Sequence, residues 1–407
     1  MKILQLTSRF RIGGIASYIQ ILSSALKKRG HEVFVCATPG TAVGQLENDR
    51  ISFVPVDLAT KFEWHPKLWA AEREVEQLVF DQKMDIIHAH TRVAQVLADR
   101  ISRKLGKPMV STCHGFYAPR LGRRLFPCLG DRVIAISPEV SEHLKRVMNV
   151  DERNISVVLN AVPVKRLLSS LESQNRAELR KQFGFSESDF ILGNVARLEK
   201  VKGHAFLLEA LGKLKDTFPS LKLMIVGSGN EKHRLEKIVA EKQLTERVLF
   251  AGEMADIVPA LRVMDAFVSP HTWEEGFGLS IAEALVCGLP IIASRTGALK
   301  KLIRDRETGI LVDAGRSDVL AEAISSLISD LSFRSRIARQ GQTFAQAAFS
   351  PDRMAKEIER VYENVIARGA RGATKQSASS EIASASFATL PRNDELCNAY
   401  SKKVVAC

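Results

Sequence analysis

Short apolar runs alternate with helix-like segments along most of this 407-residue sequence. Several of these runs are apolar throughout, as is typical of strands in a parallel sheet whose two faces are both covered. The segments between them carry the apolar period of helices, and the first ends at Gly30, where glycine commonly terminates a helix. The first set of runs predicts strands at Lys2–Ser8, His31–Thr38, Ile51–Asp57, Asp85–His90, Pro108–Gly115 and Arg132–Ser137.

The same alternation restarts after a polar stretch, Ser169–Asp189. The second set of runs predicts strands at Phe190–Arg197, Leu221–Gly229, Val248–Gly252, Asp265–Pro270, Leu289–Ser294 and Gly309–Ala314. Two sets of similar size predict an α/β protein with two Rossmann-like β/α/β domains, joined near Val164–Ser188. Ligands of open α/β sheets bind at the carboxyl ends of the strands, so two facing domains imply a cleft between them.

The domain boundaries follow from these patterns. We place an N-terminal domain at residues 1–168 and a C-terminal domain at residues 169–349. Residues 350–369 are amphipathic and open with a Ser-Pro start signal, which predicts a C-terminal helix that packs back on the N-terminal domain. Residues 370–407 are rich in Ser and Ala without a sustained period, so a mobile tail is predicted there.

The composition narrows the class of protein. Hydrophobic residues make up 45% of the chain and charged residues 26%, which is typical of a globular protein with a large core. The six cysteines include no C-x-x-C pair, so neither a zinc site nor a disulfide framework is indicated, and we expect a reducing compartment. The start lacks the apolar core of a signal peptide, and the longest apolar run, Ala284–Ala293, is too short to span a bilayer. We therefore expect a cytoplasmic protein that can also lie against the inner face of the membrane.

Two carboxylates, Glu275 and Glu283, flank a glycine-rich turn and the start of a predicted helix. Gly276 and Gly278 let the backbone approach a ligand closely, and the helix N-terminus offers unpaired N–H groups to a phosphate. The carboxylates can accept hydrogen bonds from sugar hydroxyls. Spacing alone leaves a second interpretation open, in which Glu283 is a satisfied buried acid and the turn only connects a strand to a helix.

A second group of residues favours the ligand-binding interpretation. Arg197 and Lys202 lie on a predicted loop directly after a strand, where an arginine fork and a mobile lysine charge can hold a diphosphate and stabilise it as it leaves. In the first domain, Gly14 begins a predicted helix after a strand, and His114 ends another strand. A glycine pair or a lone histidine is weak support by itself, since a lone histidine is more often structural.

Seven short motifs occur in order along the chain. They are "GG", "RGHEV", "HAH", "CHG", "ARLEKVKGH", "VGSGN" and "EEGFGLSIAEALVCGLPIIAS". Together they resemble the retaining glycosyltransferases of family 4, which have the GT-B fold. The resemblance extends from Lys2 to Arg368, and the glutamate pair with seven intervening residues, followed by "GLP", is its most specific part. One departure is "LNAVPV" where the domains join, with Ala161 and Pro163 in place of the family's usual glycine and acid.

The resemblance implies a nucleoside-diphosphate-sugar donor and a role for each site residue. It also implies that the N-terminal domain binds the acceptor and the C-terminal domain the nucleotide sugar. Glu283 would hold the ribose hydroxyls, and Glu275 would bind sugar hydroxyls near the anomeric carbon. Arg197 and Lys202 would bind the diphosphate, so Arg197, Lys202 and Glu275 are the expected catalytic residues. His114 would line the sugar or acceptor side. Backbone N–H groups would complete the phosphate cradle at Gly14, Gly276, Phe277, Gly278 and Leu279.

The family also implies the type of reaction. We expect transfer with retention of anomeric configuration to a glycan or lipid-linked acceptor, in the biosynthesis of cell-surface polysaccharide or lipopolysaccharide. No cofactor and no metal are expected, because the two cations supply the positive charge and the sequence has no Asp-x-Asp motif.

Other functions fit the residues less well. A nucleotide-sugar epimerase could share the fold and donor but would depart from the Arg/Lys and paired-Glu arrangement. A dehydrogenase is disfavoured because Lys232 stands where the third glycine of G-x-G-x-x-G belongs. The net charge of +12 allows a nucleic-acid-binding or membrane-binding protein without catalysis, but aromatic residues are only 6% and no nucleic-acid-binding motif is present, so no specific nucleic acid is expected.

The basic charge is concentrated in one segment. Residues 100–132 contain eight basic residues and one acidic residue. Within it, Arg120, Arg123 and Arg124 are interleaved with aromatic and aliphatic side chains, a pattern suited to an anionic membrane surface. A core helix with a solvated basic face is the alternative.

Overall fold

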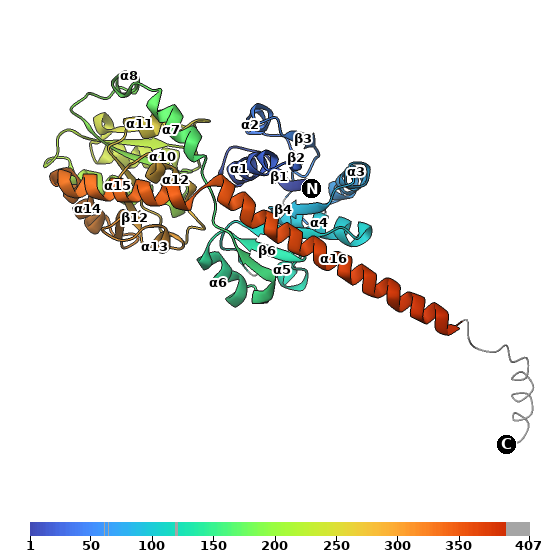
Figure 1. The fold of residues 1–407 in the computed structure, drawn as a ribbon. Coiled ribbons are helices and arrows are strands. Elements are labelled where there is room, and N and C mark those ends of the chain that lie inside the picture. Colours follow the sequence, from blue (N-terminus) through green and yellow to red (C-terminus); the bar gives the residue numbers. More distant parts are fainter. Residues whose placement is uncertain (61, 64, 119–120, 388–407) are drawn as a thin grey trace, which may run out of the picture.

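The computed structural model describes residues 1–60, 62–63, 65–118 and 121–387 (Figure 1). The described chain forms two α/β domains side by side, with a long C-terminal helix that starts between them and runs across the N-terminal domain (Figure 1). The predicted fold class, two Rossmann-like domains with parallel sheets, is confirmed.

The N-terminal domain is built on a seven-stranded parallel sheet with the order β3-β2-β1-β4-β5-β6-β7. The strands are β1 (Lys2–Arg9), β2 (Glu32–Thr38), β3 (Ser52–Pro55), β4 (Ile86–Ala89), β5 (Met109–Cys113), β6 (Arg132–Ala135) and β7 (Ile155–Val157). The helices are α1 (Gly14–Lys28), α2 (Val43–Asn48), α3 (Lys67–Asp81), α4 (Arg92–Leu105), α5 (Leu121–Leu125) and α6 (Pro138–Arg146). All four residues of β4 are buried, so its side chains do not alternate between buried and exposed.

The C-terminal domain repeats this plan with a six-stranded parallel sheet in the order β10-β9-β8-β11-β12-β13. The strands are β8 (Phe190–Val195), β9 (Leu221–Val226), β10 (Val248–Gly252), β11 (Ala266–Ser269), β12 (Ile291–Ser294) and β13 (Ile310–Val312). The helices are α7 (Val164–Glu172), α8 (Arg176–Gln182), α9 (His204–Leu214), α10 (Lys232–Glu241), α11 (Val258–Val263), α12 (Leu279–Val286), α13 (Leu299–Leu302), α14 (Ser317–Ser329) and α15 (Leu331–Ala348).

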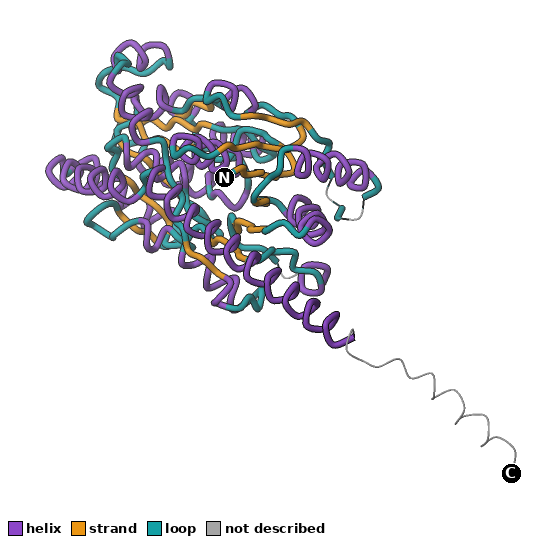
Figure 2. The backbone as a smooth tube through the Cα atoms, turned by 45° about the vertical axis from the view of Figure 1, so that its right-hand side comes forward, coloured by secondary structure: helices purple, strands orange, loops and turns teal. Residues whose placement is uncertain are grey.

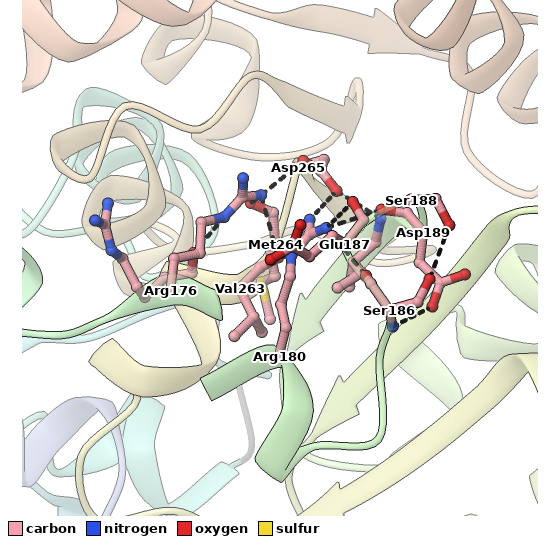
Figure 3. Close-up of polar contacts among 11 residues, drawn as sticks. Arg176, Arg180, Ser186, Glu187, Ser188, Asp189, Val263, Met264 and Asp265 are labelled. Carbon is pink, nitrogen blue, oxygen red and sulfur yellow. Dashed lines mark hydrogen bonds and ion pairs between the residues drawn. The ribbon is translucent and has the colours of Figure 1, made fainter. Parts of the chain in front are cut away.

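A buried arginine links helix α8, at the start of the second domain, to the segments before β8 and β11 (Figure 3). Arg180 on α8 is only 5% exposed and donates hydrogen bonds to the backbone carbonyls of Val263, Glu187 and Asp189. Its Nη2 also lies 2.6 Å from Asp265 Oδ2. Since Asp265 directly precedes β11, this network holds the amino-terminal edge of the sheet, which is the edge opposite the cleft.

The chain crosses between the domains twice, and the two crossings touch. Val162 donates its backbone N–H to the carbonyl of Phe349 at 3.0 Å. Ala161 and Val162 are 2% and 0% exposed, so the segment that departs from the family pattern is packed inside this junction.

The second crossing leads into α16 (Pro351–Phe387), which lies against the N-terminal domain and projects past it (Figures 1 and 2). Glu359 on α16 forms an ion pair with Arg29 at 2.6 Å and a hydrogen bond with His31 Nε2 at 2.7 Å. The helix continues to Phe387, whereas the sequence pattern ended it at Gly369 and predicted a mobile tail from residue 370. The rest of that predicted tail, residues 388–407, lies outside the described residues.

Among the helices of the described chain, none has the length together with the apolar character needed to cross a membrane.

Candidate active site

A cleft of about 1550 Å³ lies between the two domains, at the carboxyl ends of their strands. The N-terminal domain lines it with the start of α1 and with His114 after β5. The C-terminal domain lines it with the loops after β8, β9, β10 and β11 and the start of α12. The cleft contains each donor-site and catalytic side chain predicted from the sequence, namely Arg197, Lys202, Glu275 and Glu283, together with Gly14, Phe277, Gly278, Leu279 and His114.

Two helix N-termini meet across this cleft. Gly278 precedes α12 with a φ of 86°, a left-handed conformation that favours glycine. A Cβ atom on Gly14, at the start of α1, would lie 3.5 Å from Leu279 Cδ1, at the start of α12. Neither helix has an acidic residue in its first turn, so the positive ends of both dipoles are unopposed. This arrangement suits an anionic ligand such as a phosphate.

Gly276 lies where the two domains touch. A Cβ atom there would lie 2.7 Å from the backbone oxygen of His114, closer than Cβ atoms approach in folded proteins, and 3.1 Å from Gly115 Cα. Glycine at this position therefore allows the loop that carries Glu275 to reach the N-terminal domain.

Lys202, His271 and Glu275 form one compact charged group. Lys202 Nζ lies 2.7 Å from Glu275 Oε2 and 2.9 Å from His271 Nε2, and His271 Nε2 lies 3.0 Å from the same carboxylate oxygen. Ser269 Oγ is 2.5 Å from His271 Nδ1 and fixes the ring from behind. The side chains of Lys202 and Glu275 are 18% and 21% exposed, so both charges are largely removed from water.

The close contacts within this group set the charge states of Glu275 and His271. Burial alone would raise the pKa of Glu275, but the hydrogen bond to His271 and the charge of Lys202 outweigh it and hold that pKa well below its ordinary value. Burial, helped by Lys202, lowers the pKa of His271 despite the pull of Glu275. At neutral pH the group therefore consists of an ionised carboxylate, a lysine and a neutral imidazole. His271 was not predicted from the sequence, although its place two residues after β11 and four before Glu275 is a signal that could have identified it.

Arg197 lies on the same strand-end loop as Lys202 but is 73% exposed and pairs with Glu199. The loop is held close to its neighbour after β9, because a Cβ atom on Gly227 would lie 2.0 Å from the carbonyl oxygen of Ala196. The guanidinium group is thus at the cleft rim, free to turn toward an anionic ligand at little cost.

Glu283 has different surroundings. Burial raises its pKa to about 7, nearby Asp256 adds to the shift, and Arg166 opposes it. All three side chains line the cleft. A carboxylate in such a place is ready to accept hydrogen bonds from a ligand that supplies hydroxyl groups. Asp256 and Arg166 lie on separate loop and helix segments, so no local pattern indicated them.

The remaining residues predicted from the sequence differ in where the structure places them. Phe277 lines the cleft, but its side chain is 3% exposed and packs on Phe349 with ring centroids 5.4 Å apart, so only its backbone can serve a ligand. Arg123 stacks over the Tyr117 ring at 4.4 Å, and Arg124 is exposed. Arg120 lies outside the described residues.

Several cations of the basic segment, residues 100–132, are paired with acidic side chains. Arg100, Arg103 and Lys104 on α4 form ion pairs with Glu72, Asp99 and Glu76 respectively. Those acids come from α3 and from α4 itself, so much of the positive charge is balanced locally.

In the described part of the chain, no three His, Cys, Asp or Glu side chains are grouped so that they could hold a metal ion.

Comparison with known proteins identifies the family. The profile of Glycosyltransferase Family 4 matches residues 12–166, and the profile of Glycosyl transferases group 1 matches residues 175–344. The two matches together cover both domains and meet at the domain junction. The chain is a family 4 glycosyltransferase of the GT-B fold. The expected membership of the family 4 glycosyltransferases is thereby confirmed.

Several relatives of this glycosyltransferase are known by name. It is 27% identical to a phosphatidyl-myo-inositol mannosyltransferase of Mycobacterium leprae, over 88% of this chain and 95% of that protein. It is 26% identical to the lipopolysaccharide core biosynthesis mannosyltransferase LpsB of Rhizobium meliloti, over 74% of this chain and 80% of that protein. Its fold is similar to that of Anabaena HepE, solved in complex with UDP-glucose, with a TM-score of 0.78, 24% identity, and coverage of 89% of this chain and all of that one.

Proposed function

We propose that this glycosyltransferase uses a nucleoside-diphosphate-sugar donor and transfers the sugar with retention of anomeric configuration, without a metal ion. The observation that carries the proposal is the group formed by Lys202, His271 and Glu275, placed beside two opposed helix N-termini. It combines cationic and N–H donors for a diphosphate with an ionised carboxylate for sugar hydroxyls. The UDP-glucose bound to the structurally similar HepE supports this class of donor.

The chemistry assigned to these residues is charge stabilisation. The bond between the anomeric carbon and the diphosphate oxygen breaks, and its electron pair passes to the diphosphate. Lys202 and Arg197, with the N–H groups at the starts of α1 and α12, stabilise that added charge. The acceptor hydroxyl forms the new bond on the same face of the sugar and gives its proton to the departing phosphate oxygen. Glu275 holds sugar hydroxyls, so the anomeric carbon stays beside the leaving group.

Glu283 is proposed to bind the ribose. Two neighbouring hydroxyls can both donate to one carboxylate, and this interaction requires the ionised form. Because burial raises the pKa of Glu283 to about 7, a bound diol would replace the lost hydration and favour ionisation.

The acceptor is proposed to be lipid-linked and to be reached at an anionic membrane surface. The names of the M. leprae and R. meliloti relatives support an acceptor of a lipid or lipopolysaccharide kind. The N-terminal domain also exposes large apolar side chains near the basic segment, with Phe62 73%, Trp69 62% and Leu125 64% exposed. Arg92 ties their loops together, since it binds Glu63 and the backbone carbonyl of Phe126.

An assay with UDP-, GDP- and ADP-sugars in EDTA, without added NAD, tests the donor class and the metal independence. We expect release of the nucleoside diphosphate from one donor, and an α-linked product from an α-linked donor in the proton NMR spectrum. A β-linked product contradicts retention, and activity that returns only with Mn²⁺ contradicts metal independence. An epimerised sugar without transfer favours the epimerase.

A further inference from the structure

Beneath the cleft, the N-terminal sheet buries a connected set of polar side chains that the proposed chemistry does not use. Four of its members, Gln5, His88, His90 and Thr112, are 0% exposed. Buried polar groups persist where they are hydrogen-bonded, and such networks fix orientations strongly because the local dielectric is low. One end of the network reaches the cleft at His114, and the other reaches Tyr362 on α16.

Three hydrogen bonds lead from α16 to the cleft. Gln5 Nε2 donates to the Tyr362 hydroxyl at 3.2 Å. Gln5 Oε1 lies 2.6 Å from His90 Nε2, and His90 Nδ1 lies 3.1 Å from His114 Nε2. The contact between Gln5 and Tyr362 joins residues 357 positions apart in the chain.

The direction of each bond follows from Gln5. An amide oxygen can only accept, so the proton of His90 is on Nε2. Burial lowers the pKa of His90 well below its ordinary value and lowers the pKa of His114 to about 3, so both rings are neutral and carry one N–H each. Nδ1 of His90 must therefore accept, and Nε2 of His114 must donate to it. The other ring nitrogen of His114, Nδ1, then has no proton.

This unprotonated nitrogen faces the cleft. His114 lines the cleft, and its Nδ1 has no hydrogen-bond partner among the described residues. It is also absent from the buried polar atoms of the described chain that lack a partner, so the protein does not fully enclose it.

We propose that Gln5 and His90 are positioning residues that keep the proton of His114 on Nε2, so that Nδ1 presents a lone pair to the cleft and accepts a hydrogen bond from a substrate hydroxyl. The identity of the ligand group as a hydroxyl rests on the proposed function, whereas the position of the proton does not.

Gln5 is the residue that sets the direction of the whole chain of bonds. Rotating its amide by half a turn would reverse the donors at His90 and His114, and would place an N–H where the cleft now has a lone pair. The second branch agrees with the present direction. The Tyr362 hydroxyl accepts from Gln5, so its own proton is available to His88 Nδ1 at 2.7 Å, and His88 Nε2 can then donate to Thr112 Oγ1 at 2.7 Å.

The test is a two-bond ¹H–¹⁵N NMR spectrum of the full chain labelled with [¹⁵N]histidine, recorded at neutral pH without substrate. Wild type should show His114 as the neutral Nε2–H form. Gln5→Met keeps the side-chain length but removes the acceptor for His90, so His90 should turn its proton toward His114 and shift His114 to the Nδ1–H form. Tyr18→Phe is the matched control, because Tyr18 OH lies 3.4 Å from Thr112 Oγ1 on the other branch and its ring, 4.8 Å from that of His114, is retained.

Each outcome decides the proposal. It is supported if the proton moves in Gln5→Met and stays on Nε2 in Tyr18→Phe. It is overturned if wild-type His114 is charged or carries its proton on Nδ1, or if neither variant changes the tautomer. Should Gln5→Met fail to fold, the wild type alone decides, because the spectrum must show both His90 and His114 as neutral Nε2–H forms and any other pair of tautomers overturns the proposal. Since no substrate is used, failure here is separate from failure of the proposed donor chemistry.

Discussion

Glu275 and Glu283 line the same cleft, but their surroundings move their pKa values in opposite directions. Glu275 faces Lys202 and His271 and is held ionised. Glu283 on α12 is desolvated by burial and has Asp256 nearby, which makes ionisation costly. The sequence could indicate both carboxylates from their spacing. It could not indicate this difference, because the groups that cause it come from other loops.

The raised pKa of Glu283 predicts a pH dependence of stability. The folded protein binds the Glu283 proton more tightly than the unfolded chain, whose pKa is the ordinary 4.5, so the stabilisation is complete below about pH 4.5 and is lost as the pH rises through about 7. The free energy of unfolding in urea should therefore fall more steeply from pH 5 to pH 8 in wild type than in Glu283→Gln. Glu275 should not contribute to the slope between pH 5 and pH 8. Its pKa is lowered in the folded protein, so the stability that it contributes is lost only at acidic pH.

Glu274→Gln is the control for this measurement, since Glu274 is exposed one position before Glu275. Its profile should follow that of wild type. Parallel profiles for wild type and Glu283→Gln would show that the Glu283 side chain is not desolvated as the structure indicates.

The cleft cations predict a loss of turnover. Lys202→Ala or Arg197→Ala should lower kcat on the order of 10²-fold, as removal of one preorganised charge contact does elsewhere. Lys200→Ala, which alters an exposed lysine in the same turn, should leave the rate close to that of wild type. Circular dichroism should show that all three fold. Near-normal rates in both cleft variants would remove Lys202 and Arg197 from the mechanism.

At the scale of elements, helix α8 illustrates what local patterns miss. Its sequence lies in the polar stretch that marked the domain junction, and nothing there separates Arg180 from its solvated neighbours. Burial of Arg180 depends on carbonyls from the segment before β8 and the segment before β11. Similarly, β7 was not predicted because it has three residues and only the first is buried.

Arg180→Met should therefore destabilise the C-terminal domain strongly. The substitution leaves Asp265 without one of its two arginine partners and leaves several carbonyls unpaired, which costs about 3–5 kcal/mol for a buried pair. Lys181→Met, on the exposed side of the same helix, should change stability little. Thermal unfolding of both variants checks this, and equal Tm values would contradict the buried network.

The close approach of Gly276 to the backbone of His114 leads to a second prediction at the scale of elements. A methyl group there would press on the backbone of His114, so Gly276→Ala should separate the two domains slightly and displace Glu275. A displacement of about 1 Å in an active site can cost on the order of 10²-fold in rate. Gly115→Ala is the control, because a Cβ atom on Gly115 would meet no atom within 4 Å. If both variants turn over at the wild-type rate, the contact does not position the loop.

At the scale of the molecule, the sequence was sufficient for the two domains, the parallel sheets and the cleft, because each depends on repeated local periodicity. Contacts between distant segments were not predictable in this way. The pairing of Lys202 with His271 depends on how the loops after β8 and β11 meet within the C-terminal domain. The approach of Gly276 to His114 depends on how the two domains pack. The bond between Gln5 and Tyr362 depends on α16 crossing back to the first sheet.

The proposed membrane contact is tested by liposome flotation. Wild type should float with anionic vesicles at low salt and not with neutral vesicles, since each basic residue near such a surface contributes about 1 kcal/mol. The Arg120, Arg123, Arg124 triple Ala variant should remain at the bottom. A control with Lys232, Arg234 and Lys237 changed to Ala removes the same charge from α10, where these side chains are 55%, 55% and 77% exposed, and should still float. Equal behaviour of the two variants contradicts a specific docking segment.

The central claim is that the cleft recognises a diphosphate without a metal ion. Its most direct test is thermal unfolding in EDTA with UDP, GDP or ADP, each compared with its monophosphate, for wild type and Lys202→Ala. One diphosphate should stabilise wild type by about 2.7 kcal/mol at a hundred times its Kd, with a smaller effect of the monophosphate and of the variant. Stabilisation by no diphosphate, an equal effect of mono- and diphosphate, or a response that appears only with Mn²⁺ would contradict the account.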